Sequence, residues 1–114
     1  MRRLIAALVL TVALLTASPG CASAGDNHTA EGASLFSQHC AGCHINGGNI
    51  IRRNKNLKLT TLQRRGLDSV DAIAQIAREG VGMMSGYEDE LGPGNDRIVA
   101  TWILEQAQNA WIQG

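Results

Sequence analysis

The chain has 114 residues, enough for one domain, and its 10 basic residues are balanced by 10 acidic ones. Without an excess of positive charge, binding to nucleic acid is disfavoured. The sequence holds only four aromatic residues, which are Phe36, Tyr87, Trp102 and Trp111. So few large side chains build a modest core, and a large apolar cofactor would fill the deficit.

The first part of the chain has the pattern of a signal peptide. Two arginines precede an apolar run of 12 residues (4–15), which is shorter than the roughly 20 residues that span a bilayer. Small residues then lead to a cleavage site after Ala24, so we predict that 1–24 are removed and that 25–114 form the mature domain. Its net charge is 8 − 10 = −2. Lipidation of Cys21 is the alternative to this cleavage.

A helix and a long loop are predicted next. Residues 31–39 have the spacing of a helix, with Phe36 on its buried side. Residues 45–58 are rich in Asn, Gly, Arg and Lys and predict a loop, which an apolar pair, Ile50 and Ile51, interrupts.

The rest of the chain predicts further helices and no strand. A short helix is expected at 60–64 and an amphipathic one at 68–79. Glycines at 80–86 predict a loop, and a last helix is expected to run from Pro93 to about Trp111. The apolar face of this last helix comprises Val99, Trp102, Ile103 and Ala107. The predicted fold class is all-α.

The sequence Cys40-Ala41-Gly42-Cys43-His44 is the most specific motif in the chain. Two thiols at this spacing can form thioethers with the two vinyl groups of haem, and the adjacent His44 then places its imidazole at the iron. We therefore predict one covalent haem c on Cys40 and Cys43, with His44 as an axial ligand.

Two other chemistries use cysteines at this spacing. A redox-active dithiol is typical of a neighbouring βαβ pattern, and the sequence predicts no strand. A zinc site needs a fourth ligand beside the motif, and the remaining histidines, His28 and His39, are interpreted as ordinary polar positions.

Haem iron with one imidazole has a sixth position, which is open or holds a second ligand. Met83 and Met84 lie in the glycine-rich loop about 40 residues after His44. A thioether is a soft ligand that favours ferrous iron, so a methionine here would suit electron transfer. Either sulfur could reach the iron, and packing in the core is the alternative use of a methionine.

At these residues the chain resembles the class I cytochromes c, and within them the cytochrome c6 family. Gly32 resembles the glycine at which the terminal helices cross closely, and Trp102 occupies the aromatic position at that crossing. Gly80-Val81-Gly82-Met83-Met84 resembles the ligand loop and aligns Met84 with the iron ligand. The resemblance extends over 32–111 and implies a single domain of about four helices around one haem.

Three departures point to a subgroup of that family. Ser85 stands where the main group has a proline, and Ile76 aligns with a glutamine beside the haem. Residues 47–53 resemble the divergent c6B and c6C proteins. The resemblance places Ile76 in the haem environment. Apolar residues expected to exclude water there include Ile50, Leu62, Ile73 and Ile76.

The expected function is that of a one-electron carrier rather than an enzyme. The resemblance implies the thylakoid lumen or periplasm, with transient docking to a cytochrome b6f complex and to photosystem I or a terminal oxidase. No integral membrane segment is expected after processing. A basic stretch within 52–65 and an acidic one at 88–90 could orient such encounters. The alternative function is a haem-based sensor or ligand-binding protein whose sixth ligand is displaceable.

Overall fold

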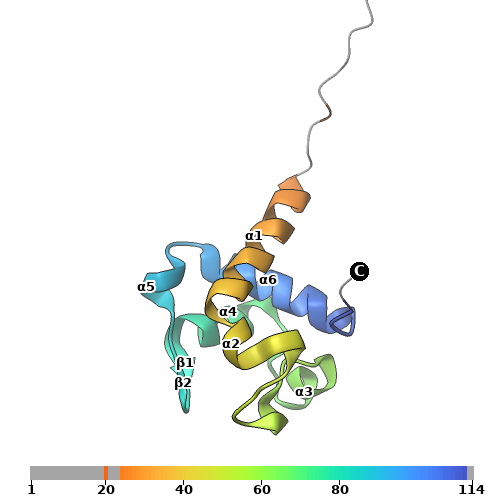
Figure 1. Ribbon diagram of the computed structural model, residues 1–114, viewed down its shortest axis with the longest axis vertical. Coiled ribbons are helices and arrows are strands. Elements are labelled where there is room, and N and C mark those ends of the chain that lie inside the picture. The colour runs from red at the N-terminus through yellow and green to blue at the C-terminus, as the bar shows by residue number, and fades with distance from the viewer. Residues whose placement is uncertain (1–19, 21–23, 113–114) are drawn as a thin grey trace, which may run out of the picture.

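The computed structural model describes Gly20 and residues 24–112, and Figure 1 shows its arrangement. The predicted signal peptide and Cys21 lie outside the described residues, apart from Gly20 and Ala24. The bounds of the helices are α1 Ala24–His39, α2 Ala41–His44, α3 Leu59–Arg64, α4 Val70–Glu79, α5 Glu88–Leu91 and α6 Asn95–Gln108. Two short 3-10 helices, Ile45–Gly47 and Arg53–Lys55, lie between α2 and α3.

The all-α prediction is confirmed, and the four longer helices, α1, α3, α4 and α6, correspond to the predicted ones. Ser69 caps α4, because its side chain accepts a hydrogen bond from the Ala72 N–H. The last helix begins at Asn95 rather than Pro93 and ends at Gln108, so Trp111 lies in the turn that follows.

The first helix is longer than predicted. It begins at Ala24, whereas the periodicity predicted residue 31. Residues 25–31 are all exposed, so no apolar residue marks a buried face there. The segment nevertheless has helical bonding, and the Thr29 hydroxyl donates to the Gly25 carbonyl.

Helices α1 and α6 cross closely, as Figure 1 shows. A Cβ added to Gly32 would lie 2.5 Å from the Trp102 Cβ, so no other residue fits at this point without movement. The prediction that a glycine permits the crossing is confirmed. Phe36, Trp102 and Trp111 then form an aromatic cluster, with centroids separated by 4.9 to 5.8 Å.

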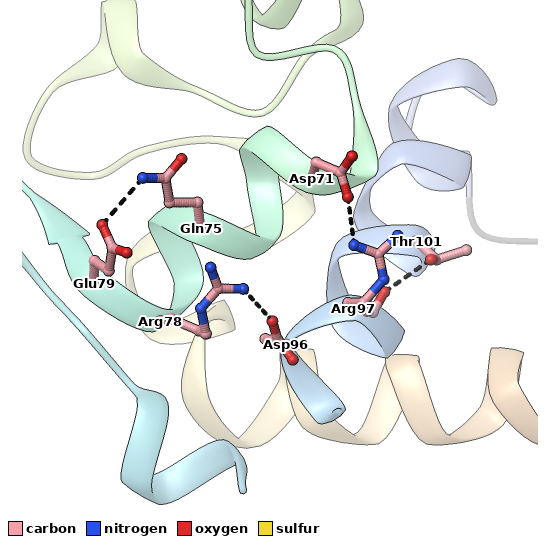
Figure 2. A network of polar contacts seen from close by, with 7 residues as sticks. All are labelled: Asp71, Gln75, Arg78, Glu79, Asp96, Arg97 and Thr101. Carbon is pink, nitrogen blue, oxygen red and sulfur yellow. Dashed lines mark hydrogen bonds and ion pairs between the residues drawn. The ribbon is translucent and has the colours of Figure 1, made fainter. Parts of the chain in front are cut away.

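Polar contacts connect α4 to α6, which Figure 2 shows in detail. Arg78 forms an ion pair with Asp96, whose side chain is only 11% exposed. Arg97 pairs with Asp71, but both of these side chains are largely exposed. The pair of Arg78 with Asp96, which is the less exposed of the two, therefore contributes more to fixing the two helices.

A small hairpin replaces the loop predicted after α4. Strands β1 (Gly80–Val81) and β2 (Met84–Ser85) are antiparallel, and Val81 pairs with Met84. The expectation of no strand was therefore wrong for these four residues. Gly80 has φ of +75°, and a Cβ there would lie 2.3 Å from the Met84 carbonyl oxygen. Only glycine lets the two strands approach in this way.

None of the helices in the described part of the chain has both the length and the apolar character needed to cross a membrane.

Candidate functional site

A cavity of about 310 Å³ lies between α2, α3, α4 and the hairpin. The lining includes residues of the Cys-x-x-Cys-His sequence at 40–44, here called the attachment motif. It also includes residues of the loop that follows this motif and of the hairpin. Its lining includes Cys40, Cys43, His44, Leu62, Ile73, Ile76 and Met84. The residues predicted to attach the haem, to bind its iron and, at Ile76, to contact it therefore line one cavity.

His44 ends the short helix α2 and is buried. Its Nδ1 lies 2.7 Å from the Gly48 carbonyl oxygen, so the N–H on Nδ1 donates to that oxygen. This bond places the proton on Nδ1 and leaves Nε2 with a free lone pair. Among residues 24–112, no hydrogen bond occupies Nε2. The ring therefore has the tautomer and orientation that a metal ligand requires.

Cys40 and Cys43 lie at the two ends of one helical turn, and neither forms a disulfide. Burial raises the pKa of the Cys40 thiol to about 11. A redox-active dithiol depends on a lowered thiol pKa, so this environment disfavours that alternative. Within the described residues, no group of three or more His, Cys, Asp or Glu side chains is arranged to hold a metal ion.

Met83 and Met84 both line the cavity but differ in exposure. Met84 lies on β2 and is half-buried, whereas Met83 lies in the hairpin turn and is 70% exposed. The Met83 sulfur is 3.5 Å from Nη2 of Arg52, which donates to it. The Met83 sulfur is therefore bonded to Arg52 in the exposed turn, and Met84 is the more buried of the two methionines.

Most of the predicted apolar lining is present, with one correction. Leu62, Ile73 and Ile76 line the cavity, but Ile50 is 65% exposed and does not. Its neighbour Ile51 lines the cavity instead. The Ile50 N–H donates to the Cys43 carbonyl, which ties this part of the loop to the attachment motif.

Sequence reasoning missed several residues of the lining. His39 was interpreted as an ordinary polar position, but it lines the cavity with its ring 6.1 Å from that of Tyr87. Its position next to Cys40 was the available signal. Arg52, Lys55 and Arg65 also line the cavity, and among the described residues no Asp or Glu does so. The mouth of the cavity is thus apolar with a positive rim.

Known proteins match this chain over most of its length. A family model described as "Cytochrome C oxidase, cbb3-type, subunit III" matches residues 27–103. A "Cytochrome c6-like" protein of Nostoc sp. is 46% identical over 104 residues, which is 91% of this chain and 94% of the relative.

Two solved structures agree with the fold. That of cytochrome c6B from Synechococcus sp. WH8102 is 75% identical, with a TM-score of 0.72 over 74% of this chain and 96% of the other. That of cytochrome c6C from Synechococcus sp. PCC 7002 is 47% identical, with a TM-score of 0.67 over 69% of this chain and 96% of the other.

The helical fold and the Cys-x-x-Cys-His motif at the cavity define a class I cytochrome c. The cavity supplies the donors that a c-type haem needs, since two thiols, an imidazole with a free nitrogen and a thioether line apolar walls. The chain belongs to the cytochrome c6 family, in the subgroup similar to cytochromes c6B and c6C. It carries one covalent haem c and functions in electron transport.

Proposed function

We propose that this chain is a one-electron carrier in which Cys40 and Cys43 attach the haem while His44 and Met84 bind its iron. The observation that carries the proposal is that His44 on α2 and Met84 on β2 line the same cavity. When bound, the haem supplies an iron that accepts and releases one electron. The protein supplies two fixed ligands, so that little has to rearrange when the charge changes.

The chain's own residues control the surroundings of that iron. The Gly48 carbonyl holds the His44 ring in place through Nδ1. Leu62, Ile73 and Ile76 exclude water from the cavity walls. We propose that Ile76 sets the potential, because an aliphatic side chain there offers no hydrogen bond to either oxidation state.

Docking of a larger redox protein is proposed at the cavity mouth. Ile51, Val81 and Met83 are exposed there and supply apolar contact area. The positive rim adds electrostatic orientation, which suits a transient partner with an acidic surface. By family resemblance we propose a cytochrome b6f complex as donor, with photosystem I or a terminal oxidase as acceptor. Residues 1–24 would direct export to the thylakoid lumen or periplasm.

A redox titration of the purified holoprotein, with carbon monoxide added to the reduced form, tests this function. The expected result is a reversible one-electron couple and no binding of carbon monoxide. Ready binding of carbon monoxide by the unmodified protein would instead favour the alternative, a haem-based sensor or ligand-binding protein.

A further inference from the structure

We propose that Arg52 is a positioning residue, which holds the methionine-bearing hairpin across the mouth of the cavity by donating a hydrogen bond to the Met83 sulfur. The contact joins residues 31 positions apart, and both of them line the cavity. This inference rests on the proposed function, in which Met84 binds the iron.

The loop that carries Arg52 is fixed by its own hydrogen bonds. The Asn49 Oδ1 accepts from the backbone N–H groups of Ile51 and Arg52, at 3.0 and 2.7 Å. The Asn49 Nδ2 donates to the Lys55 carbonyl at 3.2 Å, which closes the other end of the loop. A further bond joins the Ile50 N–H to the Cys43 carbonyl. Arg52 therefore extends from a backbone that is tied to the attachment motif.

The hairpin is held differently at its two ends. At its base, the Tyr87 N–H donates to the Ala77 carbonyl of α4 at 2.8 Å. At its tip, Met83 lies in the turn between the strands and contacts Arg52. In the part of the chain that the structure describes, no other hydrogen bond joins residues 80–85 to residues 45–57. This bond is thus the hydrogen bond that joins the tip to the loop after the attachment motif in the described residues.

The consequence for the iron follows from the position of Met83 beside Met84. Movement of the tip away from the cavity would carry the Met84 sulfur with it and leave the sixth position open to another ligand. A thioether is a weak acceptor, so the expected effect of losing the bond is modest. It should appear as easier displacement of Met84, with the ligand still bound in the absence of a competitor.

Arg53 offers a matched control for Arg52. It has the same charge and lies next to Arg52 in the same loop, and it too is exposed. Within residues 24–112, its guanidinium makes no hydrogen bond or ion pair, and only its carbonyl is engaged, by Asn56. A general effect of positive charge would therefore appear in both variants, whereas an effect of the contact would appear in one.

The test is a titration of the ferric holoprotein with imidazole, in which loss of the sulfur-to-iron charge-transfer band measures displacement of the methionine. Arg52→Ala should raise the imidazole association constant about three- to tenfold, whereas Arg53→Ala should leave it unchanged. Met83→Leu keeps the volume but removes the acceptor, and it should match Arg52→Ala. The double variant should show no further increase, because both changes remove one contact.

The outcomes separate this inference from the proposed function. Equal imidazole association constants for Arg52→Ala and Arg53→Ala overturn the positioning role. The same holds if Met83→Leu binds imidazole as tightly as the wild type does, and no more tightly. If Met84→Ala keeps the charge-transfer band, the ligand assignment fails and the inference fails with it. If Met84→Ala loses the band while Arg52→Ala has the imidazole association constant of the wild type, only the positioning role is lost.

Discussion

Met83 and Met84 are neighbours in the chain, but their environments predict different roles. Met84 is half-buried against the cavity, while Met83 is exposed and its sulfur faces Arg52. Met84→Ala is therefore expected to abolish the sulfur-to-iron charge-transfer band and open the reduced iron to carbon monoxide. Met83→Ala should keep the band, and its binding of carbon monoxide should stay far weaker than that of Met84→Ala. Absorption spectra of the ferric and the carbon monoxide-treated ferrous proteins measure both effects.

The opposite pattern in these two variants would place the hairpin in a register shifted by one residue. The pairing of Val81 with Met84 would then also be wrong, because the register of an antiparallel pair sets which side chain faces inward.

Ile76 provides a second prediction for a single residue. It lines the cavity and is half-buried, so a polar side chain there would contact the haem. Ile76→Gln is expected to raise the midpoint potential, in the direction that the resemblance to low-potential relatives with an aliphatic residue implies. A single uncharged contact of about 1–3 kcal/mol that acts on one oxidation state shifts a one-electron couple by roughly 40–130 mV.

The measurement is a midpoint titration of wild type beside Ile76→Gln, with spectra that verify intact ligation in both. Ile73→Val serves as the control, because it changes packing in the same cavity wall without adding a polar group. An unchanged or lowered potential in Ile76→Gln would reduce Ile76 to a packing residue.

Among the helices, the crossing of α1 and α6 gives a prediction about stability. A Cβ at Gly32 would overlap the Trp102 side chain, so the overlap in Gly32→Ala should lower the free energy of unfolding by about 1–3 kcal/mol. The higher helix propensity of alanine offsets roughly 1 kcal/mol of this loss. Gly42→Ala is the control, since its Cβ meets nothing within 4 Å. Denaturant unfolding of both variants should give a lower midpoint for Gly32→Ala alone.

The ion pair between α4 and α6 gives a prediction about acid stability. Burial alone would raise the pKa of Asp96, but hydrogen bonds from the Arg78 side chain and the Arg97 backbone N–H outweigh it and lower the pKa. The pair therefore stabilises the fold above the unfolded-state pKa of about 3.9, and this contribution is lost as the pH falls through the lower folded-state pKa.

Asp96→Asn should accordingly be less stable than wild type at pH 7, and the difference should shrink as the pH falls below about 4. Thermal unfolding across this pH range measures it. Asp71→Asn is the matched control, because the Asp71 side chain is 83% exposed and its pair with Arg97 is screened by solvent. A difference that persists at low pH would show that Asp96 acts through packing rather than charge.

The helices that bury an apolar face could be predicted from the sequence. Helical segments without a buried face could not be predicted in this way. Residues 70–79 present Ile73, Ala74 and Ala77 to the core at helical spacing, so that helix was predicted nearly in full. The start of α1 has no buried residue, and the four residues of α5 include three acidic ones. Neither segment leaves a periodic signal.

The candidate site could be predicted where a covalent spacing defines it. Cys40, Cys43 and His44 follow from chemistry at fixed positions. Which of Ile50 and Ile51 lines the cavity depends instead on the tertiary path of the loop, and the hairpin depends on the positive φ of Gly80. The contact of Arg52 with Met83 joins residues 31 positions apart, and local patterns contain no information about such tertiary pairs.

For the molecule as a whole, the charge at the cavity mouth has the opposite sign to that of the mature domain. The rim holds Arg52, Lys55 and Arg65 with no carboxylate among the described residues, although the predicted mature domain has a net charge of −2. The local field governs encounters at the mouth. A small anionic oxidant such as hexacyanoferrate should therefore oxidise the reduced protein more slowly as the salt concentration rises, and a cationic cobalt complex should show the reverse.

Stopped-flow kinetics at several ionic strengths measure this dependence. Lys55→Gln should weaken the salt effect for the anion, whereas Asp89→Asn, which lies on α5 and does not line the cavity, should leave it nearly unchanged. Equal salt dependence for the two oxidants would mean that the rim does not direct the encounter.

Trp111 closes the loop that follows the attachment motif. Its indole N–H donates to the Leu57 carbonyl at 3.0 Å, and its ring lies so close to Gly47 that a Cβ there would be 2.3 Å away. The loop cannot take this form until Trp111, 64 residues after Gly47, has packed against it. Closure of the segment beside Cys40, Cys43 and His44 is therefore a late step of folding, which requires the last residues of the chain.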